Sequence, residues 1–165
     1  SVVVSRIQFL QRDLGDHHAE NNMTSLSQPY SSFPGGLCHP CPWNWELFQG
    51  RCYLFSWTQT DWKSAVSACQ DIGARMVIIK SPEEQIWYVR YNKPSWIGLS
   101  DHHNEGSWKW VDNSPLQLSF WKKGEPNNHE DEDCVELYND GWNDGKCSTQ
   151  NSWICEKPSA PCPAF

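Results

Sequence analysis

The sequence has no long hydrophobic run and no excess of positive charge. Its wholly apolar stretches are short, such as Met76–Ile79, and none approaches the ~18–20 residues that span a bilayer. Thirteen Lys and Arg residues stand against twenty Asp and Glu residues, a formal charge of −7, so the basic surface that nucleic-acid binding requires is missing. The first residues also lack a signal-peptide layout. We therefore expect no nucleic-acid partner, and we expect any targeting or membrane segment to lie outside this sequence.

Catalytic and zinc motifs are missing too. The sequence contains no nucleophile elbow, zinc-protease helix or phosphate-binding loop. A glycosidase would need an acid of raised pKa in an enclosed cleft, whereas the acids of this chain cluster in a loop-like stretch. Cys38-x-x-Cys41 has zinc-like spacing, but no second Cys-x-x-Cys or His-x₃-His follows at a suitable distance. The sequence thus predicts a binding module and neither an enzyme nor a zinc protein.

Cysteine and tryptophan, in contrast, are abundant, with eight and eleven residues among 165. An even cysteine count at this density is typical of a disulfide framework formed in an oxidising compartment. Eight cysteines allow about a hundred pairings, so composition alone leaves the connectivity open. These features favour a secreted or cell-surface domain.

The chain divides near residue 37 into two parts of different composition. Residues 1–37 combine a short apolar seam with a stretch rich in Asn, Ser, Pro and Gly, which predicts a stalk remnant followed by a flexible linker. A fraying amphipathic turn explains the seam equally well. The seam consists of Val3, Ile7, Leu10 and Leu14. Asn22 begins a glycosylation sequon, and residues 38–165 are predicted to form one compact domain.

Helix and strand signals in this second part predict an α+β fold. Apolar residues at helical spacing over 62–69, preceded by the possible caps Thr60 and Asp61 and closed by Gly73, predict a first helix. Ser81-Pro82-Glu83-Glu84 predicts the start of a second helix, which should end before Pro94. Short strands are expected at Met76–Ile79, Trp96–Leu99, Trp108–Val111, Val135–Tyr138 and Trp153–Cys155. Long polar loops separate these strands, as in an α+β domain tied by disulfides.

The sequence between Glu125 and Asp144 is strongly acidic. Eight of the twenty carboxylates fall there, interleaved with asparagines and without any Lys or Arg. So many like charges repel one another unless a cation lies among them. Ca²⁺ takes about six to eight oxygen ligands from carboxylates, amides and water. The spacing is not that of an EF-hand, and a solvated acidic loop is the alternative; because tryptophans and cysteines interleave the acids, we favour an ordered calcium site.

Two short motifs within this stretch point to ion ligands. Glu125-Pro126-Asn127 brackets a proline, the residue that most readily takes a cis peptide bond. A cis bond there would aim the Glu and Asn oxygens at one ion. Asn143-Asp144 repeats the amide–carboxylate pair after Trp142.

Together these motifs resemble the C-type lectin-like domain. The matching elements are Trp96-Ile97-Gly98-Leu99, Glu125-Pro126-Asn127 and Trp142-Asn143-Asp144, with this order of cysteines. The segment from Cys38 to Tyr53 is similar to the DC-SIGN group of dendritic-cell and macrophage lectin receptors. The resemblance covers residues 38–162 and implies two helices, two small antiparallel sheets and long calcium-binding loops. It also implies the disulfides Cys38–Cys162, Cys41–Cys52, Cys69–Cys155 and Cys134–Cys147.

The resemblance further implies Ca²⁺ as cofactor, with a sugar bound directly to the principal ion. Residues that match the principal calcium and sugar ligands are Glu125, Asn127, Glu132, Asn143 and Asp144. Residues that match the auxiliary calcium ligands are Asp101, Glu105, Asn128 and again Asp144. The periphery of the sugar site is expected at His129, Tyr138 and Lys146. In this family Glu-Pro-Asn marks mannose-type ligands, with fucose as a relative, whereas Gln-Pro-Asp marks galactose.

The implied function is that of a calcium-dependent receptor ectodomain that recognises mannose- and fucose-containing glycans on glycoproteins or microbial surfaces, for recognition and uptake. The implied location is extracellular, on a single-pass type II plasma-membrane protein, with homo-oligomerisation through the stalk. Pro94 stands where DC-SIGN has an aromatic residue, and segments 87–95 and 116–124 are shortened. The alternative is a C-type lectin-like domain with altered or protein ligands, although members of that class typically lose the Glu-Pro-Asn and Trp-Asn-Asp ligands.

Overall fold

The computed structural model describes residues 38–162. The predicted stalk, linker and sequon at Asn22 lie outside this range. The helices are α2 (Trp62–Asp71) and α3 (Pro82–Val89). The strands are β1 (Glu46–Phe48), β2 (Arg51–Phe55), β3 (Arg75–Met76), β4 (Ser95–Ser100), β5 (Lys109–Trp110), β6 (Cys134–Tyr138), β7 (Gly141–Gly145) and β8 (Ser152–Pro158). Neither described helix has the length and apolar character needed to cross a membrane.

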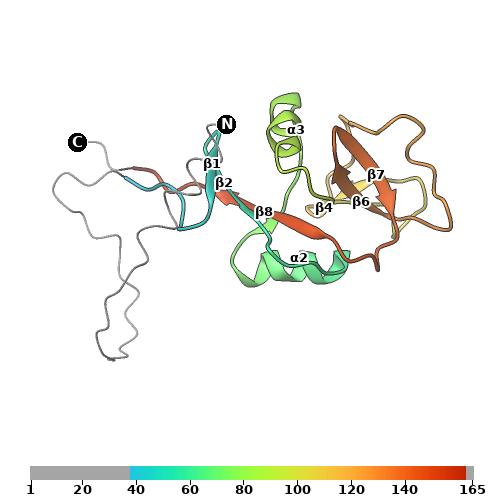
Figure 1. The fold of residues 1–165 in the computed structure, drawn as a ribbon, viewed down its shortest axis with the longest axis horizontal. Coiled ribbons are helices and arrows are strands. Elements are labelled where there is room, and N and C mark those ends of the chain that lie inside the picture. The colour runs from blue at the N-terminus through green and yellow to red at the C-terminus, as the bar shows by residue number, and fades with distance from the viewer. Residues whose placement is uncertain (1–37, 163–165) are drawn as a thin grey trace. The chain divides into compact units, whose positions relative to one another are not determined.

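The strands pair into one mixed sheet, in the order β1-β2-β8-β4-β6-β7, with β3 also on β8 and β5 also on β4. Every pair is antiparallel except β4–β8, where Trp96 lies opposite Trp153. This parallel pair joins the two antiparallel groups that the family resemblance implies as separate sheets. In Figure 1, β8 runs through the middle of the domain with α2 and α3 on opposite sides, and β6 and β7 lie toward one end.

Both helices begin at predicted caps, and of the two candidates for α2 it is Asp61, not Thr60, that caps the helix. The Asp61 carboxylate accepts the Ser64 N–H at 2.9 Å, and the Ser81 hydroxyl accepts the Glu84 N–H at 3.2 Å. Each bond satisfies a backbone donor that has no partner within its helix. The Glu84 side chain accepts the Lys80 N–H at 2.9 Å, which further fixes the start of α3. The sequence prediction of two helices is therefore confirmed, including the end of α3 before Pro94.

The strands agree less closely with the sequence. Of the predicted strand Met76–Ile79, only Met76 pairs as part of a strand, in β3 with Arg75, although Val77–Ile79 are buried as expected. Val77 still donates to Ile154 at 2.9 Å and accepts from Gly98 at 2.8 Å, so this short segment fills the space between β8 and β4. Strands β1, β2 and β7 are absent from the prediction.

Four disulfides hold the domain together, in the pairs that the family resemblance implies: Cys38–Cys162, Cys41–Cys52, Cys69–Cys155 and Cys134–Cys147. Cys69–Cys155 ties α2 to β8 inside the core, where both residues have no exposed surface. Cys134–Cys147 joins the start of β6 to the chain just after β7, beside the acidic loops. The long loops near β6 and β7 are thus anchored at their base by a covalent bond.

Candidate calcium and sugar site

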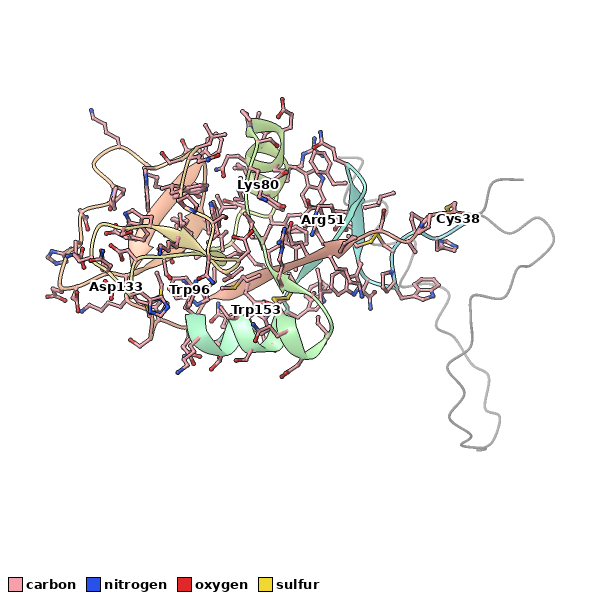
Figure 2. All side chains as sticks on the ribbon, turned by 180° about the vertical axis from the view of Figure 1, so that it is seen from behind. Cys38, Arg51, Lys80, Trp96, Asp133 and Trp153 are labelled. Atoms are coloured by element: carbon pink, nitrogen blue, oxygen red, sulfur yellow. A yellow bond between two sulfur atoms is a disulfide. The ribbon has the colours of Figure 1, made fainter. Side chains whose placement is uncertain are left out.

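The acidic residues gather in loops at one end of the domain. Figure 2 shows Asp133 at the end opposite Cys38. Strands β6 and β7 are antiparallel, with Val135 opposite Asp144 and Glu136 opposite Asn143. The buried Trp142 donates its indole N–H to Gln85 of α3 at 2.8 Å, which fixes the strand immediately before Asn143. The sheet and α3 therefore hold the polar ends of β7 in place against the loop that contains Glu125.

The Glu-Pro-Asn loop and Asp144 form one hydrogen-bonded unit. The Asn127 backbone N–H donates to Glu125 Oε2 and to Asp144 Oδ1, both at 3.1 Å. Asn127 Nδ2 donates to Glu125 Oε1 at 3.1 Å, and the Asn128 N–H donates to Asp144 Oδ2 at 2.7 Å. The Glu125–Pro126 peptide bond is cis. The structure thus brings together four residues that match calcium ligands of the resembled family: Glu125, Asn127, Asn128 and Asp144.

The other two predicted principal ligands adjoin this unit. Asn128 Oδ1 accepts the Glu132 N–H at 2.9 Å, so Glu132 closes the same loop. Asn143 precedes Asp144 on β7 and donates from Nδ2 to Glu136 Oε1 at 3.0 Å. Every principal residue is therefore within this loop–strand network, while its role as a ligand stays a prediction.

The carboxyl groups of this network repel one another when no cation lies among them. Desolvation, together with the hydrogen bond and charge of Asp144, raises the pKa of Glu125 to about 7. Desolvation and then the charge of Asp144 also raise the pKa of Glu132. Both shifts favour the protonated forms. A cation bound among these groups would reverse that preference.

A second acidic group lies where β4 ends and β6 begins. Carboxylate oxygens of Asp101, Glu105 and Asp133 lie within 4.8 Å of one another. The Asp101 N–H donates to the Asp133 carbonyl at 3.0 Å, which brings the two residues together from distant parts of the chain. The predicted auxiliary set contains Asp101 and Glu105 but not Asp133. Asp133 could have been selected from the sequence because it lies in the acidic stretch, directly before Cys134.

Two buried oxygens show that this second group fits a cation. Asp101 Oδ2 accepts the Gly106 N–H at 2.8 Å, but Asp101 Oδ1 and Asp133 Oδ1 are buried with no hydrogen-bond partner among the described residues. Desolvation raises the pKa of Asp101, and the charges of Asp133 and Asp144 raise it further. A buried carboxylate oxygen without a partner is destabilising. Carboxylate and amide oxygens are the donors that Ca²⁺ prefers, so the residues present fit this ion.

The three residues of the predicted sugar periphery lie on the exposed surface. His129 is exposed and donates its backbone N–H to Asn127 Oδ1 at 3.0 Å. Lys146 pairs with Glu130 at 2.5 Å. The Lys122 ammonium lies 4.3 Å from the centre of the exposed Tyr138 ring. All three are thus accessible from solvent, whereas Asp144 is buried.

The chain is similar in sequence to one known domain family and to several known proteins. The Lectin C-type domain family matches residues 58–157. CD209 antigen of Macaca mulatta is 52% identical over 133 residues, which are 76% of this chain and 33% of that protein. CD209 antigen-like protein A of Mus musculus is 47% identical over 154 residues, 88% of this chain and 65% of that protein.

The chain is also similar to a solved structure of the same fold. The carbohydrate-recognition domain of cow CD23, in the presence of GlcNAc2Man3 oligosaccharide, superposes with a TM-score of 0.70 and 39% identity, over 76% of this chain and 100% of that one. The chain itself spans about a third of the length of the Macaca mulatta relative. The fold, the disulfides and the family match all agree: this chain belongs to the C-type lectin domain family.

Proposed function

We propose that this domain binds Ca²⁺ in its acidic loops and, through that ion, the vicinal hydroxyls of mannose- and fucose-type glycans. As a C-type lectin domain related to the CD209 antigens, the chain is a binding module and not an enzyme. The observation that carries the proposal is the hydrogen-bonded unit of Glu125, Asn127 and Asp144. A second support is the pair of buried, unpartnered oxygens on Asp101 and Asp133.

The chemistry of the principal residues suits two neighbouring hydroxyls. When bound, Ca²⁺ supplies a Lewis acid that accepts one lone pair from each hydroxyl. The carboxylates of Glu125 and Glu132 only accept hydrogen bonds, so they would accept one from each sugar hydroxyl. The amides of Asn127 and Asn143 also donate, so they satisfy the remaining hydroxyl lone pairs. This pairing of donors and acceptors matches equatorial vicinal hydroxyls, such as the 3- and 4-OH of mannose.

We further propose that the full protein is an extracellular glycan receptor anchored as a type II plasma-membrane protein. The CD209 relatives are longer than this chain. We propose that the whole molecule takes up glycoproteins or microbes, self-associates through residues 1–37 and is glycosylated at Asn22. A single sugar site that is small and exposed binds weakly. Multivalent display would raise the avidity by about 10²–10⁴-fold.

Calorimetric titration tests the domain's part of this proposal. Ca²⁺ is titrated into EDTA-treated and dialysed protein, and methyl α-mannoside is then titrated with and without Ca²⁺. We expect calcium binding in the first experiment and heat from the sugar only in the presence of Ca²⁺. Calcium binding without sugar binding would instead favour an altered or protein ligand, in keeping with Pro94 and the two shortened segments.

A further inference from the structure

Glu136 holds two asparagine side chains, Asn143 of β7 and Asn151 just before β8. It lies opposite Asn143 in the β6–β7 pair. Its Oε1 accepts from Asn143 Nδ2 at 3.0 Å, and its Oε2 accepts from Asn151 Nδ2 at 2.7 Å. Neither Glu136 nor Asn151 belongs to the predicted ligand sets, so these contacts have a separate explanation.

The carboxylate determines which way the Asn143 amide faces. An ionised carboxylate only accepts hydrogen bonds, whereas an amide has a donor nitrogen on one branch and an acceptor oxygen on the other. With Nδ2 turned to Glu136, the Oδ1 of Asn143 is left on the opposite branch. An oxygen is the atom that a calcium ligand must present. The second N–H of Nδ2 is still available for another acceptor.

Glu136 is itself held in place from the other side. The residue that holds it, Asn151, is only 6% exposed. The backbone of Asn151 is fixed by two hydrogen bonds with Thr60, at 2.9 and 3.0 Å. Because the Asn151 amide is anchored in this way, it is a fixed donor that orients the Glu136 carboxylate. The chain of contacts therefore runs from the Thr60 loop, through Asn151 and Glu136, to Asn143.

We propose that Glu136 is a positioning residue that locks the Asn143 amide with its oxygen presented to calcium and one N–H presented to the sugar. This inference rests on the proposed function. A glutamine at position 136 would offer one donor and one acceptor, so it could not hold both amides in their present orientation and would let Asn143 flip. Its loss of charge would also weaken calcium binding by electrostatics alone. Calcium affinity by itself therefore cannot separate positioning from charge.

Sugar affinity at saturating Ca²⁺ separates the two effects. The test compares Glu136→Gln with Asp140→Asn, which removes one charge from the exposed turn between β6 and β7. Methyl α-mannoside is titrated into each protein by calorimetry, at a Ca²⁺ concentration above which the measured sugar affinity no longer changes. We expect Glu136→Gln to bind the sugar about tenfold more weakly, or worse, as for other groups that orient metal ligands. Asp140→Asn should stay within about twofold of the unchanged protein.

A second measurement needs neither calcium nor a variant that folds. In calcium-free protein, nuclear magnetic resonance should show slow solvent exchange for the side-chain amide protons of Asn143 and Asn151, compared with the exposed Asn104. Equal sugar affinity for the two variants at saturating Ca²⁺ would overturn the proposal, as would an Asn143 amide that exchanges as fast as that of Asn104. If the unchanged protein bound no calcium, the proposed function would fail while the amide measurement still decided whether Glu136 holds Asn143.

Discussion

The Asn127 backbone N–H donates to Asp144 Oδ1 at 3.1 Å, although 17 positions separate the two residues in the sequence. Asp144 is fully buried and its other oxygen accepts the Asn128 N–H. The Glu-Pro-Asn loop is therefore fastened to β7 through a carboxylate that is itself a predicted ligand. The position of the loop is therefore coupled to the positions of the predicted ligands.

Asp133→Asn should weaken the calcium site at the end of β4. The variant removes a carboxylate charge that faces Asp101 and Glu105, and calcium affinity depends on the number of charged ligands. We expect at least a roughly tenfold weaker second binding event in a calcium titration. The exposed neighbour Asp131 provides the matched control, Asp131→Asn. An Asp133→Asn isotherm that coincides with that of the control would exclude Asp133 from the site.

The same variant should not destabilise the calcium-free protein. The Asp133 charge raises the pKa of Asp101 by repulsion, and replacing that charge with an amide relieves it. We expect the midpoint of thermal unfolding in EDTA to stay the same or rise, and the stabilisation by Ca²⁺ to shrink. A lower midpoint in EDTA would show that Asp133 has a stabilising role unrelated to a cation.

The double variant Glu125→Gln with Asn127→Asp should change sugar preference from mannose toward galactose. It converts Glu-Pro-Asn into Gln-Pro-Asp, the motif that marks galactose in the family that this chain resembles. The exchange keeps one carboxylate and one amide but swaps their places, so donors and acceptors meet the two hydroxyls in the opposite order. Competition by free mannose and free galactose for an immobilised glycan measures the change. The single variant Glu125→Gln serves as control and is expected to weaken both sugars.

Calcium affinity should fall as the pH is lowered from 7 to 5. The pKa of Glu125 is raised to about 7 in the absence of calcium, by desolvation and then by Asp144. Below pH 7 the ion must therefore displace a proton from a ligand, and we expect a loss of affinity of roughly tenfold or more at pH 5. Calorimetry in two buffers of equal ionic strength measures it. Equal affinities at both pH values would rule out this linkage.

In the calcium-free protein, by contrast, the Glu125 carboxyl should contribute more to folding stability at pH 5 than at pH 7. A carboxyl whose pKa is higher in the folded state than in the unfolded state binds its proton more tightly when folded. The contribution of Glu125 to stability is thus present below its ordinary pKa and is lost as the pH rises through about 7. Thermal unfolding in EDTA at both pH values provides this comparison.

Removing the disulfide Cys69–Cys155 should destabilise the domain more than removing Cys41–Cys52. The first closes a loop with a sequence separation of 86 and the second one of 11. Chain entropy alone gives about 4–5 kcal/mol for the longer loop and about 3 kcal/mol for the shorter one. Urea unfolding of the two paired Cys→Ala variants tests the order. A larger loss for Cys41–Cys52 would show that packing around that bond outweighs loop length.

Local signals explain why the helices could be predicted from the sequence. Asp61 and Ser81 cap helices through bonds to residues three positions ahead, so the information lies within one turn. Strand β7 contains two glycines, an Asn and an Asp, residues that are depleted in strands. It forms because β6 pairs with it along its whole length, and that partner lies outside any local window.

The candidate site likewise contains some residues that local motifs predict and others that only the folded structure brings together. The Glu-Pro-Asn and Asn-Asp motifs are contiguous, so their residues could be selected from the sequence. Asp133 reaches Asp101 because strands β4 and β6 are neighbours in the sheet. The contacts of Glu136 with Asn143 and Asn151 likewise depend on strand register and side-chain orientation. Neither strand register nor side-chain orientation can be predicted from sequence spacing. For that reason the sequence does not single out Asp133 or Glu136.

Retention on immobilised mannose tests the central claim most directly. The protein is applied in Ca²⁺, and separate portions are then washed with EDTA, free mannose or free galactose. We predict retention in Ca²⁺, release by EDTA and by mannose, and no release by galactose at the same concentration. Flow-through of folded, calcium-loaded protein would contradict the assignment of a calcium-bridged mannose site.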